Sequence, residues 1–210
     1  MTESRGFYAQ MRSVLRERLL DAAADLTCAD GWKAVTMGAV ADRVGISRQS
    51  VYKEIGSKAA LSEAVISRET DRVLAGVIGR LREHGEDAVA GIPAAVDYVL
   101  AAGADNPLIK AILVGAHGGD ADLLPLLASR PEPVLARAIA VVGAEARDLY
   151  RDLPVLPQTL DRLSEIVVRL TLSHLMQPTG PIEEAVAQAR LIIETALTQV
   201  APQDGASTTP

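Results

Sequence analysis

Apolar residues recur at helical spacing through most of this 210-residue chain. Between about Gln10 and Ala29, for example, Leu15, Leu19 and Leu26 fall on one face of a helix, and Asp30-Gly31 ends the segment. Such segments are rich in Ala, Leu, Arg and Glu, are separated by Gly and Pro, and rarely alternate apolar and polar residues with a period of two. The sequence therefore predicts an all-α protein.

The Gly and Pro residues that interrupt these segments set the expected helix boundaries. Beyond the first helix, short helices are expected at residues 37–44 and 48–55, and a long helix at about 58–82. Residues 202–210 form a polar tail that we expect to be disordered. The remaining helices are expected at about 88–102, 107–116, 123–128, 133–151, 157–176 and 181–200.

The charge of the chain is unevenly distributed. The net charge is −6, but residues 1–60 carry a balance of +2, so the remainder carries −8. An anionic partner such as DNA is therefore expected to bind the first sixty residues. No uninterrupted apolar run reaches the about 18 residues of a membrane-spanning helix, and the first residues lack the apolar stretch of a secretory signal. Together with the single Cys28, these features predict a cytoplasmic protein with no membrane partner.

The two short helices are joined by a turn that is centred on Gly45. Thr36 can cap the first helix, Ala41 is small where the two helices would cross, and Ile46 and Val51 can fill the space between them. This spacing predicts a helix-turn-helix, the motif that places its second helix in the major groove of DNA. A plain helical hairpin is the alternative on spacing alone.

The second short helix is rich in hydrogen-bond donors. Arg can bind guanine bidentately and Gln can bind adenine, whereas Ser, Tyr and Lys suit phosphate oxygens. Lys58 adds a cation at the start of the next helix, beside free backbone N–H groups. The candidate DNA-binding residues are Thr36, Ser47, Arg48, Gln49, Ser50, Tyr52, Lys53 and Lys58.

Residues 31–61, GWKAVTMGAVADRVGISRQSVYKEIGSKAAL, resemble the DNA-binding domain of TetR-family transcriptional regulators. The resemblance rests on the combination of Gly31, Thr36, Ala41, Gly45, Ser47, Tyr52, Lys58 and Leu61. It implies that Thr36, Ser47, Tyr52 and Lys58 hold phosphates, with Arg48, Gln49 and Ser50 at the bases. It also implies a helix-turn-helix domain at residues 1–57 and a larger helical effector-binding and dimerisation domain at 58–201.

The segment departs from the family pattern near the end of the second short helix. Ile55 stands where the family usually has Phe, and Lys53 and Glu54 stand where aromatic residues or His are more usual. Ile can fill the same core position, whereas Glu54 beside a phosphate would tune or weaken binding. Arg5, Arg12, Arg16 and Arg18 lie ahead of this motif, where they either reach DNA or are solvated surface charges.

The last two expected helices are candidates for a dimer interface. A dimer is favoured because paired recognition helices read a palindrome, whereas one helix binds weakly. The alternative is that these apolar stripes only close the core of the monomer. The candidate interface residues are Leu163, Val167, Leu170, Ala189, Ile192, Ile193 and Ala196.

A ligand cavity in the larger domain would be mainly aliphatic, because Tyr98 and Tyr150 are the only aromatic residues after residue 60. An apolar effector is therefore favoured over a planar cation. A buried structural network explains the candidate polar residues at least as well as ligand binding does. These candidates are Tyr98, His117, Tyr150, Arg169, Ser173 and His174.

No catalytic, metal-binding or cofactor motif is found in the sequence. We therefore expect no enzyme activity, no catalytic residue, no metal and no cofactor. The function expected is that of a dimeric repressor, which an apolar effector releases from a palindromic DNA operator. The alternatives are a ligand-independent regulator or activator, and a helical small-molecule-binding protein that does not bind DNA.

Overall fold

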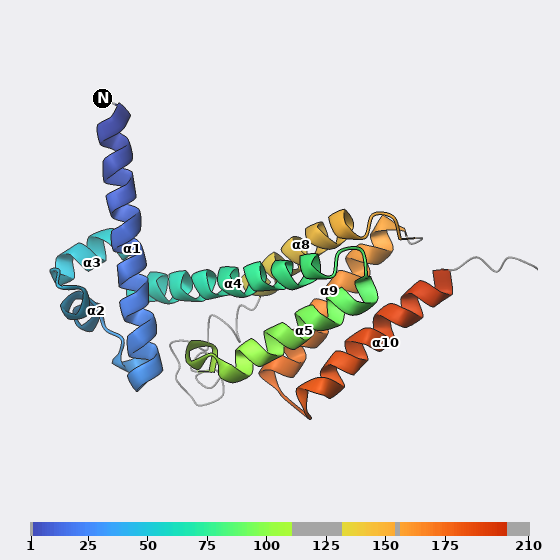
Figure 1. The fold of residues 1–210 in the computed structure, drawn as a ribbon. Helices are drawn as coiled ribbons and strands as arrows, with labels where there is room; N and C mark the ends of the chain where they lie inside the picture. The colour runs from blue at the N-terminus through green and yellow to red at the C-terminus, as the bar shows by residue number, and fades with distance from the viewer. Residues whose placement is uncertain (1, 111–131, 154–155, 201–210) are drawn as a thin grey trace, which may run out of the picture. The chain divides into compact units, whose positions relative to one another are not determined.

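A computed structural model describes residues 2–110, 132–153 and 156–200. Within these ranges the chain is helical, with no strand, as predicted (Figure 1). The elements are α1 (Thr2–Asp30), the 3-10 turn η1 (Trp32–Ala34), α2 (Met37–Val44), α3 (Arg48–Ile55), α4 (Lys58–Glu83), α5 (Ala88–Asp105), α8 (Glu132–Leu149), α9 (Pro157–Met176) and α10 (Ile182–Val200). Residues 107–110 are also helical. The rest of the helix expected at 107–116, and the helix expected at 123–128, lie outside the described residues.

Helix α1 begins at Thr2, eight residues before the expected start at Gln10. The side chains of Phe7, Tyr8 and Met11 are exposed. This first part of the helix therefore follows no buried apolar stripe, and hydrophobic spacing could not detect it.

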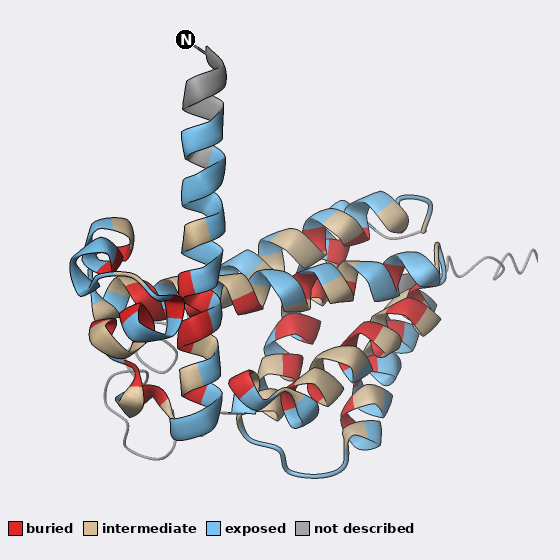
Figure 2. Ribbon diagram, turned by 60° about the vertical axis from the view of Figure 1, so that its left-hand side comes forward, coloured by how far each residue is buried: buried red, intermediate tan, exposed pale blue. Residues whose placement is uncertain are grey.

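The chain divides into two compact units, and α4 is divided between them after Arg72. The first unit comprises Met1–Arg72 and Ala104–Val134. Its core is formed where α1, α2 and α3 pack together with the first part of α4 (Figure 2). The fully buried side chains at its centre include Leu19, Val40, Val51 and Leu61.

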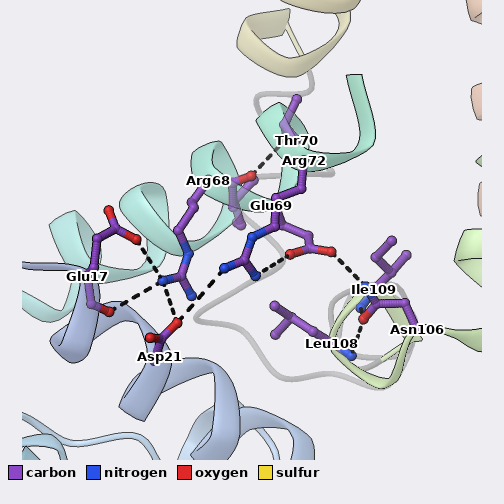
Figure 3. Close-up of polar contacts among 10 residues, drawn as sticks. Glu17, Asp21, Arg68, Glu69, Thr70, Arg72, Asn106, Leu108 and Ile109 are labelled. Atoms are coloured by element: carbon purple, nitrogen blue, oxygen red, sulfur yellow. Dashed lines mark hydrogen bonds and ion pairs between the residues drawn. The ribbon is translucent and has the colours of Figure 1, made fainter. Parts of the chain in front are cut away.

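A polar network ties α4 to α1 within the first unit (Figure 3). Arg68 of α4 donates to Asp21 at 2.8 Å and to the Glu17 carboxylate at 3.2 Å, both on α1. On the next residue of α4, the Glu69 carboxylate accepts a 2.7 Å hydrogen bond from the Asn106 amide. The Asn106 side-chain oxygen in turn accepts the backbone N–H of Leu108 at 2.9 Å, as a helix cap does. The network therefore holds α4 against α1 and against the start of the helix at 107–110.

The second unit comprises Val73–Gly103 and Leu135–Pro210. Its core is built from α5, α8, α9 and α10, with Leu100, Tyr150, Ala189 and Ile193 among its buried residues. Gly91 lies against the Tyr150 hydroxyl so closely that a Cβ at this position would come within 2.8 Å of it. The absence of a side chain at Gly91 therefore lets the Tyr150 ring pack against α5.

Helix α5 is long and apolar enough to cross a membrane by length and composition alone, with a mean hydropathy of 1.3. It contains Asp97 and Asp105. Its buried residues, such as Val96 and Leu100, pack in the second unit, as those of a core helix do.

Candidate nucleic-acid interface

Helices α2 and α3 form the predicted helix-turn-helix, and each is capped by the expected hydroxyl. The Thr36 Oγ1 atom accepts the backbone N–H of Ala39 at 3.0 Å, and the Ser47 Oγ atom accepts that of Ser50 at 3.1 Å. Gly45 ends α2 in the left-handed region, with φ of 78°, where a side chain would be strained. The two short helices are therefore fixed by local interactions that the sequence specifies.

One face of α3 packs into the first unit and the opposite face is exposed. Val51 is fully buried, Ile55 is buried, and Ile46 in the preceding turn packs against the same core. Ile55 therefore fills the position where the family pattern has Phe. The exposed residues of α3 are Arg48, Gln49, Ser50, Tyr52 and Lys53.

Arg48 and Tyr52 interact one turn apart on this exposed face. The Arg48 guanidinium lies 5.4 Å from the centre of the Tyr52 ring and donates a 3.2 Å hydrogen bond to its hydroxyl. This hydrogen bond raises the pKa of Arg48 above its ordinary value. The Tyr52 ring limits the conformations of the Arg48 side chain, so the guanidinium has a defined position on the exposed face of α3.

Lys58 lies at the first position of α4, where it is half-buried. Its ammonium is 5.5 Å from the centre of the Trp32 ring. In the same turn, the Ser57 Oγ atom accepts the backbone N–H of Ala60 at 3.1 Å. A helix N-terminus with a cation beside it is suited to a phosphate.

Glu54, the one acidic residue of α3, is paired with an arginine from another helix. Its carboxylate accepts a 3.1 Å hydrogen bond from Nε of Arg12, which belongs to α1. Sequence reasoning identified both residues but not their contact. They are 42 positions apart, and no local pattern links them.

Two family models match the chain. "Bacterial regulatory proteins, tetR family" matches residues 19–65, and "Bacterial Tetracyclin repressor, C-terminal domain" matches residues 87–195. The chain belongs to the TetR family. TetR-family members are DNA-binding transcriptional regulators and not enzymes, so the predicted function class is confirmed. The first matched region contains the whole helix-turn-helix.

A sequence relative and two solved structures are similar to this chain over most of its length. The chain is 31% identical to the HTH-type transcriptional regulator AlkX of Mycobacterium tuberculosis over 86% of this chain and 84% of that protein. Among crystal structures, the TetR-family repressor AlkX from Dietzia sp. superposes with a TM-score of 0.70 at 21% identity, covering 89% of this chain and 97% of that one. A TetR-family regulator from Streptomyces coelicolor gives 0.60 at 22% identity, with 88% and 98% covered. These superpositions show that the fold is shared.

The candidate effector residues that the structure describes differ in burial. Tyr150 is buried, and its hydroxyl has no hydrogen-bond partner among the residues that the structure describes. Burial raises its pKa to about 12, with the nearby Asp87 and Glu145 contributing. Tyr98 is half-buried, lies over Gly76 and has the Arg80 guanidinium 5.8 Å from its ring centre. His117 lies outside the described residues.

Arg169 and Ser173 lie away from the core-facing side of α9, whereas His174 faces α10. Arg169 is exposed and donates to Glu165 on the same helix at 2.8 Å, and Ser173 is also exposed. The half-buried His174 is 3.1 Å from the amide oxygen of Gln188 on α10. The i to i+4 spacing placed Arg169 and Ser173 on one face correctly. It could not indicate that the face is exposed.

The candidate dimer residues fall into two groups. Val167, Ala189 and Ile193 are buried in the core of their own unit, which leaves them almost no surface for a partner. The half-buried residues are Leu163, Leu170, Ile192 and Ala196. Two further apolar residues are exposed on these helices, Ile166 of α9 at 48% and Leu191 of α10 at 63%. Their signal in the sequence is an apolar residue on the otherwise polar face of each helix.

Proposed function

We propose that the chain is a dimeric repressor that binds a palindromic operator in the cytoplasm and leaves it when an apolar small molecule binds the second unit. The observation that carries this proposal is the exposed face of α3, which presents cations and neutral donors while its one carboxylate is paired with Arg12. A surface of this kind is complementary to the edges of bases and to phosphates.

On this proposal, the residues of the helix-turn-helix divide between bases and phosphates. Arg48 and Gln49 read bases, because both side chains can bind bidentately and both are exposed near the start of α3. Ser50 is assigned to the same base-reading group. Thr36, Ser47, Tyr52, Lys53 and Lys58 hold the backbone.

The exposed faces of α9 and α10 support the dimer. Ile166, Arg169 and Ser173 share one face of α9 because they are spaced by three and four residues. Ile166 there and Leu191 on α10 expose apolar side chains that a second copy would cover. A two-fold dimer presents two recognition helices, which matches a palindromic operator.

The effector is proposed to be aliphatic. The core of the second unit is lined mainly by Ala, Val, Leu and Ile, and Tyr150 is its one buried aromatic residue. The Dietzia repressor is described as implicated in the biodegradation of n-alkanes. A series of straight-chain alkanes, alcohols and fatty acids is therefore the first set of ligands to test.

Helix α4 is the proposed route from effector to DNA. It runs as one helix from the first unit into the second. In the first unit, Arg68 fixes α4 to α1 through Glu17 and Asp21. An effector that binds more tightly when α4 takes a position unsuited to DNA would lower operator affinity. The loss equals the difference in the effector's binding free energy between the two positions of α4, typically about 1–3 kcal/mol.

The test starts from selection of bound fragments out of a random duplex library at about 0.15 M salt, where weak phosphate-only binding is suppressed. A palindromic consensus is expected. The aliphatic series is then titrated against the complex of protein and operator, and the effector should raise the melting temperature and lower operator affinity together. A compound that stabilises the protein but leaves operator affinity unchanged is not the effector.

The opposite sign of regulation is the second candidate. The chain is 32% identical over 91 residues to the HTH-type transcriptional activator FasR of Mycolicibacterium smegmatis, which covers 42% of each protein. An activator would use the same α3 surface. A promoter reporter carrying the selected operator decides between the two, because deleting the regulator raises expression if it represses and lowers expression if it activates.

A further inference from the structure

Glu54 places a carboxylate on α3, the helix that the proposed function sets against the phosphates of DNA. An uncompensated negative charge there would oppose binding. In the structure the Glu54 side chain is only 12% exposed, and the side chain of its partner Arg12 is 70% exposed. The negative group is therefore covered and the positive group faces solvent.

The geometry of this pair leaves the charged end of Arg12 available. The 3.1 Å bond to Glu54 uses Nε of the guanidinium. Within the described part of the chain, the two terminal amino groups of Arg12 make no further hydrogen bond. Arg68 and Arg18 of the same unit are used differently, because Arg68 binds two carboxylates of α1 and Arg18 binds the carbonyl of Val44.

The position of the pair on α3 points toward the DNA backbone. Ser47, Ser50 and Glu54 are spaced by three and four residues, so they share one flank of the helix. The two serine hydroxyls on this flank are 2.8 Å apart, and both are exposed. Arg12 therefore extends a flank that begins with Ser47, which the proposed function assigns to the DNA backbone.

We infer that Arg12 is a further contact to the DNA backbone and that Glu54 is the positioning residue that holds it beside α3. The inference rests on the proposed use of α3 as the DNA-facing helix. The hydrogen bond to Nε fixes the direction of the guanidinium, and the terminal amino groups donate to a phosphate oxygen. The carboxylate thus offsets its own repulsion by orienting a cation between itself and the DNA.

The first experiment measures the affinity of Arg12→Ala for the selected operator and for a mixed-sequence duplex, over a range of salt concentrations. Loss of one phosphate contact should weaken both complexes about fivefold near 0.15 M salt and reduce the salt slope by about one. Arg16→Ala is the matched control, because it removes the same charge from an exposed position one turn further along α1. The inference is overturned if Arg12→Ala leaves the slope unchanged, or if Arg16→Ala changes it equally.

The second experiment tests the positioning role with two variants of equal charge. Glu54→Gln keeps an oxygen that can accept the Arg12 Nε–H, whereas Glu54→Ala does not. Glu54→Gln is expected to bind both duplexes about threefold more tightly than Glu54→Ala, the size of effect of a modest hydrogen bond. In the Arg12→Ala background this difference should disappear. Equal binding by the two variants when Arg12 is present would show that Glu54 does not position it.

Two further readouts separate this inference from its alternatives. If the pair only joined α1 to α3, Arg12→Ala would lower the melting temperature and leave the salt slope unchanged, and that outcome overturns the inference. If the wild-type protein prefers no sequence, base reading by α3 fails. The effect of Arg12 on the mixed-sequence duplex can still be measured in that case, so the two failures are distinguishable.

Discussion

The exposed faces of α3 and α9 are both polar, but they use their charges differently. On α3, Arg48 and Lys53 are exposed, and the one acidic residue is covered by an arginine from another helix. On α9, Arg169 is bound by Glu165 of the same helix, and the exposed face includes the apolar Ile166. The first face keeps its donors for an anion, whereas the second balances its own charge and suits another protein surface. A charged residue thus indicates a binding site only when its neighbours leave it available.

The largest expected effect tests the assignment of α9. Ile166→Asp places an unpaired charge in the proposed dimer interface and should weaken dimerisation by about 3 kcal/mol. Operator affinity should then fall at least a hundredfold, because one recognition helix binds weakly. Sedimentation equilibrium measures the first effect and fluorescence anisotropy with labelled operator the second. Ser173→Ala, on the same face, is the control with little expected change, and an Ile166→Asp protein that remains dimeric would contradict the assignment.

The next effect tests base reading by α3. Arg48→Ala should cost about 1–3 kcal/mol of affinity for the selected operator and relax the choice at one base pair. Competition binding with all four bases at each operator position measures this directly. Tyr52→Phe is a useful companion variant, because it keeps the ring under the arginine and removes the 3.2 Å hydrogen bond. An equal loss with Arg48→Ala on operator and scrambled DNA would assign Arg48 to the backbone instead.

A smaller and uniform effect is expected at the start of α4. Lys58→Ala should weaken all duplexes about fivefold near 0.15 M salt and lower the salt slope by about one, because a phosphate contact carries no sequence information. Titrations at several salt concentrations on two unrelated duplexes provide the measurement. A loss restricted to the operator would make Lys58 a specificity residue.

The smallest effect compares the buried polar groups of the two units. The buried carboxylate of Glu69 in the first unit accepts a hydrogen bond, whereas the Tyr150 hydroxyl in the second finds no partner within residues 2–110, 132–153 and 156–200. Tyr150→Phe removes this unpaired hydroxyl and should raise the free energy of unfolding by about 1 kcal/mol. Chemical denaturation of both proteins at neutral pH tests the sign, and destabilisation by Tyr150→Phe would reveal a partner for the hydroxyl.

The same residue predicts a pH dependence. Folding raises the pKa of Tyr150 from 10.0 to about 12, so the proton is held more tightly in the folded state. The resulting stabilisation is fully present below pH 10 and is lost as the pH rises toward 12. The unfolding free energy of the wild type should therefore fall over this interval relative to that of Tyr150→Phe. Parallel curves for the two proteins would contradict the shift.

Much of the helix-turn-helix could be predicted because its determinants are local. Thr36 and Ser47 cap helices that begin at the next residue, and Gly45 adopts the positive φ that the turn requires. Each of these interactions joins residues within a few positions of one another, so the spacing in the sequence contains the information. The early start of α1 at Thr2 was missed because its first residues bury no apolar stripe.

The second unit could be predicted as helical, but its exposed and buried faces could not be assigned in full. The stripe of α9 that includes Leu163, Val167 and Leu170 has the same spacing whether it faces a core or a partner. Packing buries Val167 and leaves the neighbouring Ile166 exposed.

The sequence by itself determined the all-α class, the helix-turn-helix and the donor-rich face of α3, because helical period, caps and turn glycines act between near neighbours. Only the tertiary structure decided which charges are already satisfied. The pairing of Glu54 with Arg12, and the network from Arg68 to Glu17 and Asp21, join residues more than forty positions apart. Such contacts depend on how helices pack against one another, and that packing is fixed by the whole buried core rather than by any short segment.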